Sequence, residues 1–263
     1  MIQSESKPLI TVVTVVLNGQ DVIEETIKSV IGQNYNSFEY IVIDGNSIDK
    51  TPEIISQYHD QIDLSIRESD SGIYDAMNKA ISKARGKYIN FLNAGDTFYG
   101  KDILKRVSVV LENKQPDLFY ARQEFFWPQK ERTMILGREL TLNNIKRGEA
   151  ALHQTMFTKT TLLNQLGGFD TRYKIAADYD LLYRIYLKDS NLFFANMITT
   201  RFPIGGASSD SKTTYREMLL IIKKHSNLYY YLLYFIVGGF RLIVRPFFKR
   251  YTTGPIRKFL KQI

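Results

Sequence analysis

The chain has 263 residues, of which 44% are hydrophobic and 24% charged, as in a globular protein of one large domain or of a domain with an appendage. It contains no cysteine, which excludes disulfides, thiol catalysis and thiolate metal sites. The formal net charge is +8, and the segment from Lys212 onward holds eleven Lys and Arg residues against one acidic residue. This basic tail predicts an anionic partner, either a membrane surface or nucleic acid.

Strands and helices are predicted to alternate over the first hundred residues. The uninterrupted β-branched run at residues 10–17 is typical of a parallel strand that is covered on both faces. Further strands are predicted at residues 40–43, at 63–67 and from 88, with helices between them at 23–31, from 51 and at 73–84. We expect Gly86 to end the last of these helices. The alternation predicts a parallel sheet with right-handed crossovers.

The second half of the chain has a less regular pattern. Helices are predicted at residues 102–112 and 177–188, strands at 117–121, 152–158 and 192–198, and an irregular segment at 122–148. From residue 213 the chain is expected to be helical. Its apolar and aromatic run at residues 228–237 is too short to span a bilayer, but it suits a helix pair lying in a membrane interface. We therefore predict a domain at residues 1–211 and a basic amphipathic helical extension at 212–263.

Polar groups follow the predicted strands. The stretch YINFLNAGD at residues 88–96 predicts a buried strand that delivers Asn93 and Asp96 to the sheet edge where ligands of α/β proteins bind. A carboxylate on such a tight loop suits a divalent cation that also holds phosphate oxygens. Asp44 and Asp178 are expected at the same edge. Each acid alone could be a helix cap or a turn residue, but turns do not require all three to share one edge.

Four segments in this order resemble family 2 glycosyltransferases: TVVTVVLN at residues 11–18, IDGNSIDKT at 43–51, FLNAGD at 91–96 and IAADYDLLYRI at 175–185. The resemblance covers about residues 9–208. It implies an α/β fold of the GT-A type, a Rossmann-like mixed central sheet flanked by helices as in nucleotide-diphospho-sugar transferases. To this fold the chain adds a C-terminal helical tail that we expect to associate with a membrane. The resemblance also implies sugar transfer from a nucleotide diphosphate sugar with inversion of configuration.

The resemblance implies roles for particular residues. The donor would be held by residues at the ends of the first strands and in segment 70–79: Thr14, Val16, Asn18, Asp44, Asn46, Ser71, Gly72, Lys79, Asn93 and Ala94. Where the family has Asp-x-Asp-Asp this chain has Asn93 to Asp96, so only Asp96 is left to bind Mn²⁺ or Mg²⁺. Asp178 stands at the family's catalytic base. An acceptor contact or a lid is expected from His153, Gln154, Asp180, Gly205 and Gly206, for which a partly buried histidine and an ordinary turn are the structural alternatives.

These inferences predict an inverting, metal-dependent glycosyltransferase. We expect it to move a sugar, from UDP by family frequency, to a hydroxyl of a lipid-linked glycan acceptor during synthesis of cell-surface polysaccharide. The N-terminus has no apolar signal core, and the tail is basic and aromatic. We therefore expect peripheral binding at the cytoplasmic, inner face of a bacterial plasma membrane, no nucleic-acid partner, and a tail that could also pair two chains into a homodimer.

Other functions remain open on the sequence. Transfer to a polyprenyl phosphate would use the same fold and the same acids. A nucleotidyltransferase is disfavoured, because the loop at residues 18–21 has no basic residue to grip a triphosphate. A catalytically silent, basic-tailed binding module would bind RNA or DNA and would not turn over nucleotide sugars. A Rossmann dehydrogenase is disfavoured because no G-x-G-x-x-G follows the first strand.

Overall fold

The computed structural model describes residues 7–127, 129, 131–204 and 211–251. Contacts between residues divide the chain into two compact units. The first comprises residues 1–140 and 150–207, and the second comprises residues 141–149 and 208–263. Residues 141–149 thus group with the C-terminal helices and not with the sheet.

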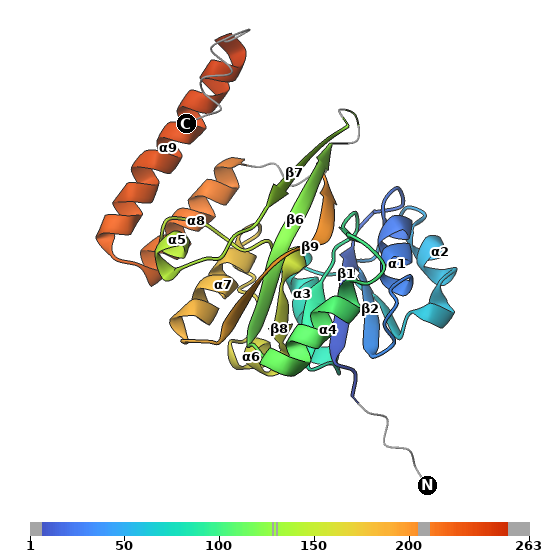
Figure 1. Cartoon of the computed structure of the whole chain (residues 1–263). Coiled ribbons are helices and arrows are strands. Elements are labelled where there is room, and N and C mark those ends of the chain that lie inside the picture. Colours follow the sequence, from blue (N-terminus) through green and yellow to red (C-terminus); the bar gives the residue numbers. More distant parts are fainter. Residues whose placement is uncertain (1–6, 128, 130, 205–210, 252–263) are drawn as a thin grey trace. The chain divides into compact units, whose positions relative to one another are not determined.

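The first unit is built on one mixed sheet, in which nine strands are present among the described residues (Figure 1). The strands are β1 (Ile10–Val16), β2 (Phe38–Asp44), β3 (Leu64–Arg67), β4 (Tyr88–Phe91), β5 (Thr97–Phe98), β6 (Leu118–Trp127), β7 (Arg132–Leu136), β8 (Phe157–Lys159) and β9 (Leu192–Pro203). Their spatial order is β3-β2-β1-β4-β8-β6-β9-β5, and β7 pairs with β6. The sheet is parallel from β3 to β4, which confirms the predicted alternation, and β8 is antiparallel to both of its neighbours.

Helices of the first unit cover both faces of this sheet. They are α1 (Ile23–Ile31), α2 (Thr51–Ser56), α3 (Ile73–Lys83), α4 (Ile103–Lys114), α6 (Thr160–Gln165) and α7 (Ala177–Leu187), with 3-10 turns η1 (His59–Gln61) and η3 (His153–Thr155). Successive residues of a strand point to opposite faces. Val12 of β1 joins a core that contains apolar residues of α1 and α4, whereas Val13 lies outside that core, and α3 packs on β1 and β2. Both faces of β1 are therefore buried, which explains its continuous apolar sequence.

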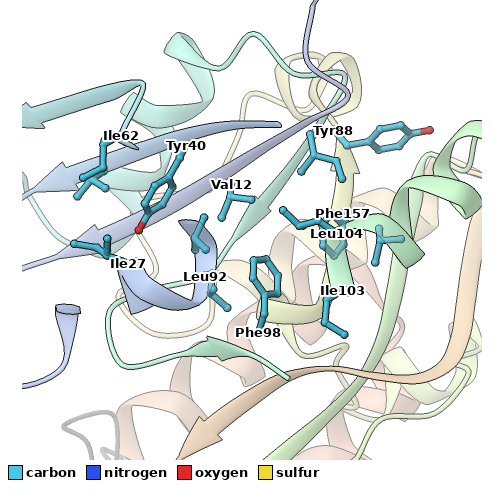
Figure 2. Packing of buried hydrophobic residues seen from close by; sticks show 14 of the residues in the cluster. Val12, Ile27, Tyr40, Ile62, Tyr88, Leu92, Phe98, Ile103, Leu104 and Phe157 are labelled. Atoms are coloured by element: carbon cyan, nitrogen blue, oxygen red, sulfur yellow. The ribbon is translucent and has the colours of Figure 1, made fainter. Parts of the chain in front are cut away.

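The core between the sheet, α1 and α4 holds the strands in register (Figure 2). Tyr40 and Leu92 are fully buried in it, from β2 and from the residue that follows β4. Phe157 of β8 and Leu104 of α4 are fully buried as well. Each such side chain contributes roughly 1.5–3 kcal/mol of hydrophobic stabilisation, so this core fixes the strand ends that carry the polar residues.

Two predicted segments and one predicted helix end are wrong. Residues 122–148 contain the second half of β6, the paired strand β7 and the helix α5 (Leu142–Lys146) where we expected irregular structure. Residues 152–158 contain the turn η3 before the short strand β8 and are not one strand. Gly86 is not a helix cap. A Cβ on it would lie 2.5 Å from the Thr11 backbone nitrogen, so glycine is required there for close packing against β1.

The second unit contains α5, α8 (Ser211–His225) and α9 (Leu228–Tyr251). Its helices approach closely where small residues occur: a Cβ on Gly238 would lie 2.5 Å from the ring of Tyr215, and one on Gly148 would lie 2.3 Å from the ring of Tyr234. The described part of the predicted tail, up to residue 251, is helical as expected, and residues 252–263 lie outside the described residues. Among the described residues, no helix combines the length and the apolar character needed to cross a membrane.

Candidate active site

The carboxyl ends of β1, β2 and β4 meet at one edge of the sheet, because the three strands are parallel and in register. Val16 pairs with Asp44, and the Ala94 N–H donates to the Val15 carbonyl, so the segments after β2 and β4 lie on either side of β1. Asn18 follows β1 in the left-handed conformation, with a φ of 52°, which asparagine tolerates better than most residues. Its N–H donates to Ser47 Oγ at 2.8 Å, and this bond ties the loops after β1 and β2 together.

Asp44 ends β2 and is almost fully buried. Its Oδ1 accepts bonds from the N–H and Oγ of Ser47, at 2.9 and 2.5 Å. Its Oδ2 accepts no hydrogen bond from the described residues and lies 3.4 Å from Nε of Arg67. A buried carboxylate oxygen without a bonded donor is costly unless a ligand supplies one. The sequence analysis did not identify Arg67 as a site residue, although it ends β3 and pairs with Asp44 across the sheet.

The other residues expected to bind the donor at this edge differ in how deeply they are buried. The Thr14 hydroxyl is fully buried, where it donates to the Leu92 carbonyl at 2.8 Å and accepts from Tyr40 at 3.0 Å. Its side chain is therefore part of the core. Val16 is also buried. Asn46, with a φ of 68°, is more open, and its Nδ2 lies 3.4 Å from Ser69 Oγ.

Segment 70–79 packs beside the end of β2. A Cβ on Gly45 would lie 2.5 Å from Asp70 Oδ2, so this glycine allows the two loops to touch. Ser71 donates its N–H to Asp75, and Gly72 precedes α3 with a φ of 135° that favours glycine. Lys79 is held by other protein groups: its Nζ donates to the Ser69 carbonyl at 2.8 Å and lies 3.1 Å from a Glu68 carboxylate oxygen.

The loop after β4 turns sharply and buries Asp96. Gly95 has a φ of 96°, and Thr26 accepts the Gly95 N–H and donates to the Asp96 carbonyl. Burial raises the pKa of the Asp96 carboxyl to about 7, although the charge of His153 and a hydrogen bond from Gln154 oppose this. Asn93 Nδ2 lies 3.1 Å from His153 Nε2, and Asn93 Oδ1 has no hydrogen-bond partner among the described residues.

Asp178 lies in the first turn of α7, near the positive end of the helix dipole, which favours a carboxylate. It is not the helix cap, which is Ala176. Its Oδ2 lies 3.3 Å from His153 Nδ1, and its Oδ1 lies 3.3 Å from the Tyr74 hydroxyl. Burial by itself would lower the pKa of His153, but the hydrogen bond and the charge of Asp178, with the charge of Asp96, raise it above its ordinary value.

The structure thus brings Asp96 and Asp178 together around His153. Asp44 lies two strands from β4, a separation of about 10 Å at the usual strand spacing. A small pocket is lined by His153, Asp178 and Thr158, and its remaining walls are apolar: Phe91, Met156, Leu163, Phe169 and Leu181. Apolar walls on one side limit the access of water to the carboxylate and strengthen its interactions with charged groups.

Asp180 does not contribute to the site. Asp180 is fully buried and pairs with Arg184 at 2.7 Å, and Arg184 also donates to the carbonyls of Leu166 and Gly168. We assign this ion pair a structural role in the turn before α7. Gly205 and Gly206, expected to form a lid, lie outside the described residues.

Comparisons with known proteins identify the family of the chain. Residues 11–166 match the model of the family described as Glycosyl transferase family 2. A PGL/p-HBAD biosynthesis glycosyltransferase of Mycobacterium tuberculosis is 28% identical over 188 residues, which are 68% of this chain and 70% of the relative. An uncharacterised glycosyltransferase of the same species is 32% identical over 189 residues, which are 69% of this chain and 70% of the relative.

Solved structures agree on the fold. S. aureus TarS 1-349 in complex with UDP-GlcNAc has a TM-score of 0.71 at 19% identity, covering 93% of this chain and 76% of that one. Mannosyltransferase PcManGT from Pyrobaculum calidifontis, in complex with GDP-Man and Mn²⁺, has a TM-score of 0.64 at 16% identity, covering 98% of this chain and 80% of that one. The expected GT-A fold is confirmed. The chain belongs to glycosyl transferase family 2 and is a glycosyltransferase.

Proposed function

We propose that this glycosyltransferase moves a sugar, with inversion, from a UDP-sugar to a hydroxyl of a lipid-linked glycan acceptor at the inner face of a bacterial plasma membrane. The observation that carries the proposal is the meeting of Asp178 and Asp96 around His153, at the edge where Asp44 also lies. One solved structure with the same fold supports the donor class, and one relative in sequence supports the acceptor class. TarS was solved with UDP-GlcNAc, and a mycobacterial relative is named for PGL/p-HBAD biosynthesis.

An inverting transfer requires one base and no covalent intermediate. The acceptor oxygen forms a bond to the anomeric carbon as the bond from that carbon to the phosphate oxygen breaks, and the phosphate leaves with the electron pair. The acceptor proton goes to the Asp178 carboxylate. Asp178 suits this role because a quarter of its side chain is exposed, at a pocket whose other walls are mainly apolar.

The loop after β4, residues 93–96, offers oxygen ligands that suit a divalent cation. The described residues contain no cluster of three or more His, Cys, Asp or Glu residues that could hold a metal. Magnesium sites nevertheless often use one or two carboxylates together with substrate phosphates. Asp96 supplies a buried carboxylate, and Asn93 supplies an amide oxygen without a partner among the described residues. These two residues would hold Mg²⁺ or Mn²⁺, which when bound would neutralise charge that develops on the diphosphate.

A thermal-shift panel of nucleotide sugars, with and without Mn²⁺, tests the donor assignment. A ligand at one hundred times its Kd stabilises the native state by about 2.7 kcal/mol, which raises Tm by several degrees in a chain of this size. We expect the largest shift from a UDP-sugar with Mn²⁺, and a reduced shift for Asp44→Ala. A larger shift from GDP-mannose would contradict the choice of UDP, and the absence of any shift and of any sugar transfer would favour the silent binding module.

The C-terminal helix α9 supports the membrane part of the proposal. Five of its apolar or aromatic residues are 45–70% exposed and share one helical face: Leu228, Tyr229, Leu232, Phe235 and Ile236. Lys223 and Lys224, near the end of α8, are exposed as well. An exposed apolar stripe with Lys and Arg nearby suits the interface of an anionic membrane, where each basic residue contributes about 1 kcal/mol.

We expect Leu232→Asp combined with Ile236→Asp to lower binding to anionic vesicles at least tenfold, because charge would replace the centre of the apolar stripe. Vesicle flotation measures this binding, and salt should weaken it in the wild-type protein. Val109→Asp is the matched control, since Val109 is 53% exposed on α4 of the first unit. If the double variant floats like wild type, the membrane contact is wrong. If it converts a dimer to a monomer and leaves flotation unchanged, the stripe is a subunit interface.

A further inference from the structure

The two carboxylate oxygens of Asp178 have neighbours from two distant parts of the chain. Oδ2 lies 3.3 Å from His153 Nδ1, and Oδ1 lies 3.3 Å from the hydroxyl of Tyr74. Tyr74 is in the first turn of α3, directly after the loop that packs beside the end of β2. Asp178 is therefore linked through His153 to the loop after β4, and through Tyr74 to segment 70–79, which is expected to bind the donor.

We propose that Tyr74 and His153 are positioning residues that hold the Asp178 carboxylate in the orientation needed to accept the acceptor proton. The proposal rests on the proposed function of Asp178 as the base. A carboxylate on a short side chain rotates readily unless neighbours fix both oxygens, and small errors in the placement of a base lower catalysis strongly. Neither residue needs to touch the substrate for this role.

Tyr74 is itself held rigidly. Its ring is almost fully buried and lies 5.3 Å from the ring of Phe169, which lies 5.3 Å from that of Phe91. The hydroxyl donates to the Ile175 carbonyl at 2.6 Å. Because Ile175 immediately precedes the cap of α7, this bond fixes the entry into the helix that carries Asp178. The hydroxyl has one proton, which this bond uses, so Tyr74 positions Asp178 through the start of α7, while Oδ1 itself accepts the Tyr179 N–H at 2.8 Å.

His153 is fixed from the opposite side. Its turn, η3, is fastened to β4 because Asn90 Nδ2 donates to the carbonyls of Gln154 and Met156, at 2.8 and 2.9 Å. The side chain then reaches Asp178 through Nδ1 and Asn93 through Nε2. In the neutral imidazole, an Nδ1–H that donates to Asp178 leaves Nε2 to accept from the Asn93 amide. His153 therefore connects Asp178, the proposed base, to the loop after β4, with a different ring nitrogen facing each.

The test compares Tyr74→Phe with Tyr88→Phe in a sugar-transfer assay on the full chain. Phenylalanine keeps the contact with Phe169 and removes only the hydroxyl. Tyr88 is also fully buried, but it starts β4, at the opposite edge from Asp96, and its hydroxyl has no hydrogen-bond partner among the described residues. We expect Tyr74→Phe to lower kcat at least tenfold while the KM and Kd of the donor stay within twofold. Tyr88→Phe should keep kcat within twofold.

The two nitrogens of His153 allow a second, matched comparison. Asparagine places its amide nitrogen near the position of Nδ1, whereas glutamine reaches the position of Nε2. We therefore expect His153→Asn to retain at least fivefold more kcat than His153→Gln, because the contact with Asp178 is the one that matters. Equal kcat values in these two variants, or the reverse order, would overturn the role assigned to His153.

For Tyr74, a kcat within twofold of wild type would overturn the proposal. So would a loss of kcat accompanied by a proportional rise in donor Kd, since the hydroxyl would then support donor binding and not the base. These outcomes differ from failure of the proposed function itself. In that case the wild-type protein would show no sugar transfer with any donor that raises its Tm.

Discussion

Replacing Asp178 with Asn should lower kcat for sugar transfer by about 10²–10⁴-fold, the usual contribution of a general base. Asparagine has nearly the same shape, so the neighbours His153 and Tyr74 can stay in place, but its amide cannot accept the acceptor proton. We expect the Kd of the donor to remain within twofold, because Asp178 lies beyond the segments assigned to the nucleotide. Release of UDP in the presence of acceptor measures kcat, and thermal shift measures donor binding.

Asp189→Asn is the control for this substitution. Asp189 is exposed just beyond the other end of α7 and has a φ of 53°, a conformation that asparagine accepts readily. We expect its kcat to match that of wild type. A kcat above one tenth of wild type in Asp178→Asn would show that another group accepts the proton. Asp180 would be a poor candidate, because it is fully buried against Arg184.

The parallel half of the fold could be predicted because burial leaves a direct trace in the sequence. Strands covered on both faces require continuous apolar runs, and residues 10–17 and 40–43 supply them. The polar residues that follow such runs must leave the core at one edge. This reasoning placed Asp44 and Asp96 beyond the strands. In the structure Asp96 lies in the loop after β4, whereas Asp44 is the last residue of β2 itself.

The second half could not be predicted as well because its strands are stabilised by distant partners. β6 extends to Trp127 since it pairs with both β7 and β9, and no local pattern specifies those neighbours. The role of Tyr74 was hidden for a similar reason. In the sequence it is one more aromatic residue in an amphipathic helix, while the groups that its hydroxyl contacts lie about a hundred residues further along the chain.

Asp178 and Asp180 show the same limit on a smaller scale. Residues two apart on a helix point in very different directions, so only one of the pair can face a given site. The sequence offered both as site residues. The structure places Asp178 at the pocket and Asp180 against Arg184, a choice that depends on how α7 packs and not on the spacing of the acids.

Replacing Asp96 with Asn should abolish or strongly reduce transfer and at the same time stabilise the metal-free protein. Burial raises the pKa of this carboxyl from its ordinary 3.8 to about 7, so ionising it costs more in the folded state than in the unfolded state. The cost therefore appears above about pH 4, grows as pH rises and levels off above pH 7. At its full size it is on the order of 4 kcal/mol, and asparagine does not incur it.

Urea unfolding in EDTA at pH 5 and pH 8 measures this effect, and we expect the stability advantage of Asp96→Asn to be larger at pH 8. Asp117→Asn is a control for which we expect the opposite change in the free energy of unfolding. Although partial burial alone would raise the pKa of Asp117, its bonds from Lys159 and Asn191 lower it, so that variant should lose stability. Mn²⁺ with UDP should then reduce the advantage of Asp96→Asn, because only the carboxylate gains from the cation. An advantage independent of pH would contradict the buried carboxylate, and an equal response of both proteins to Mn²⁺ would contradict its role as the metal ligand.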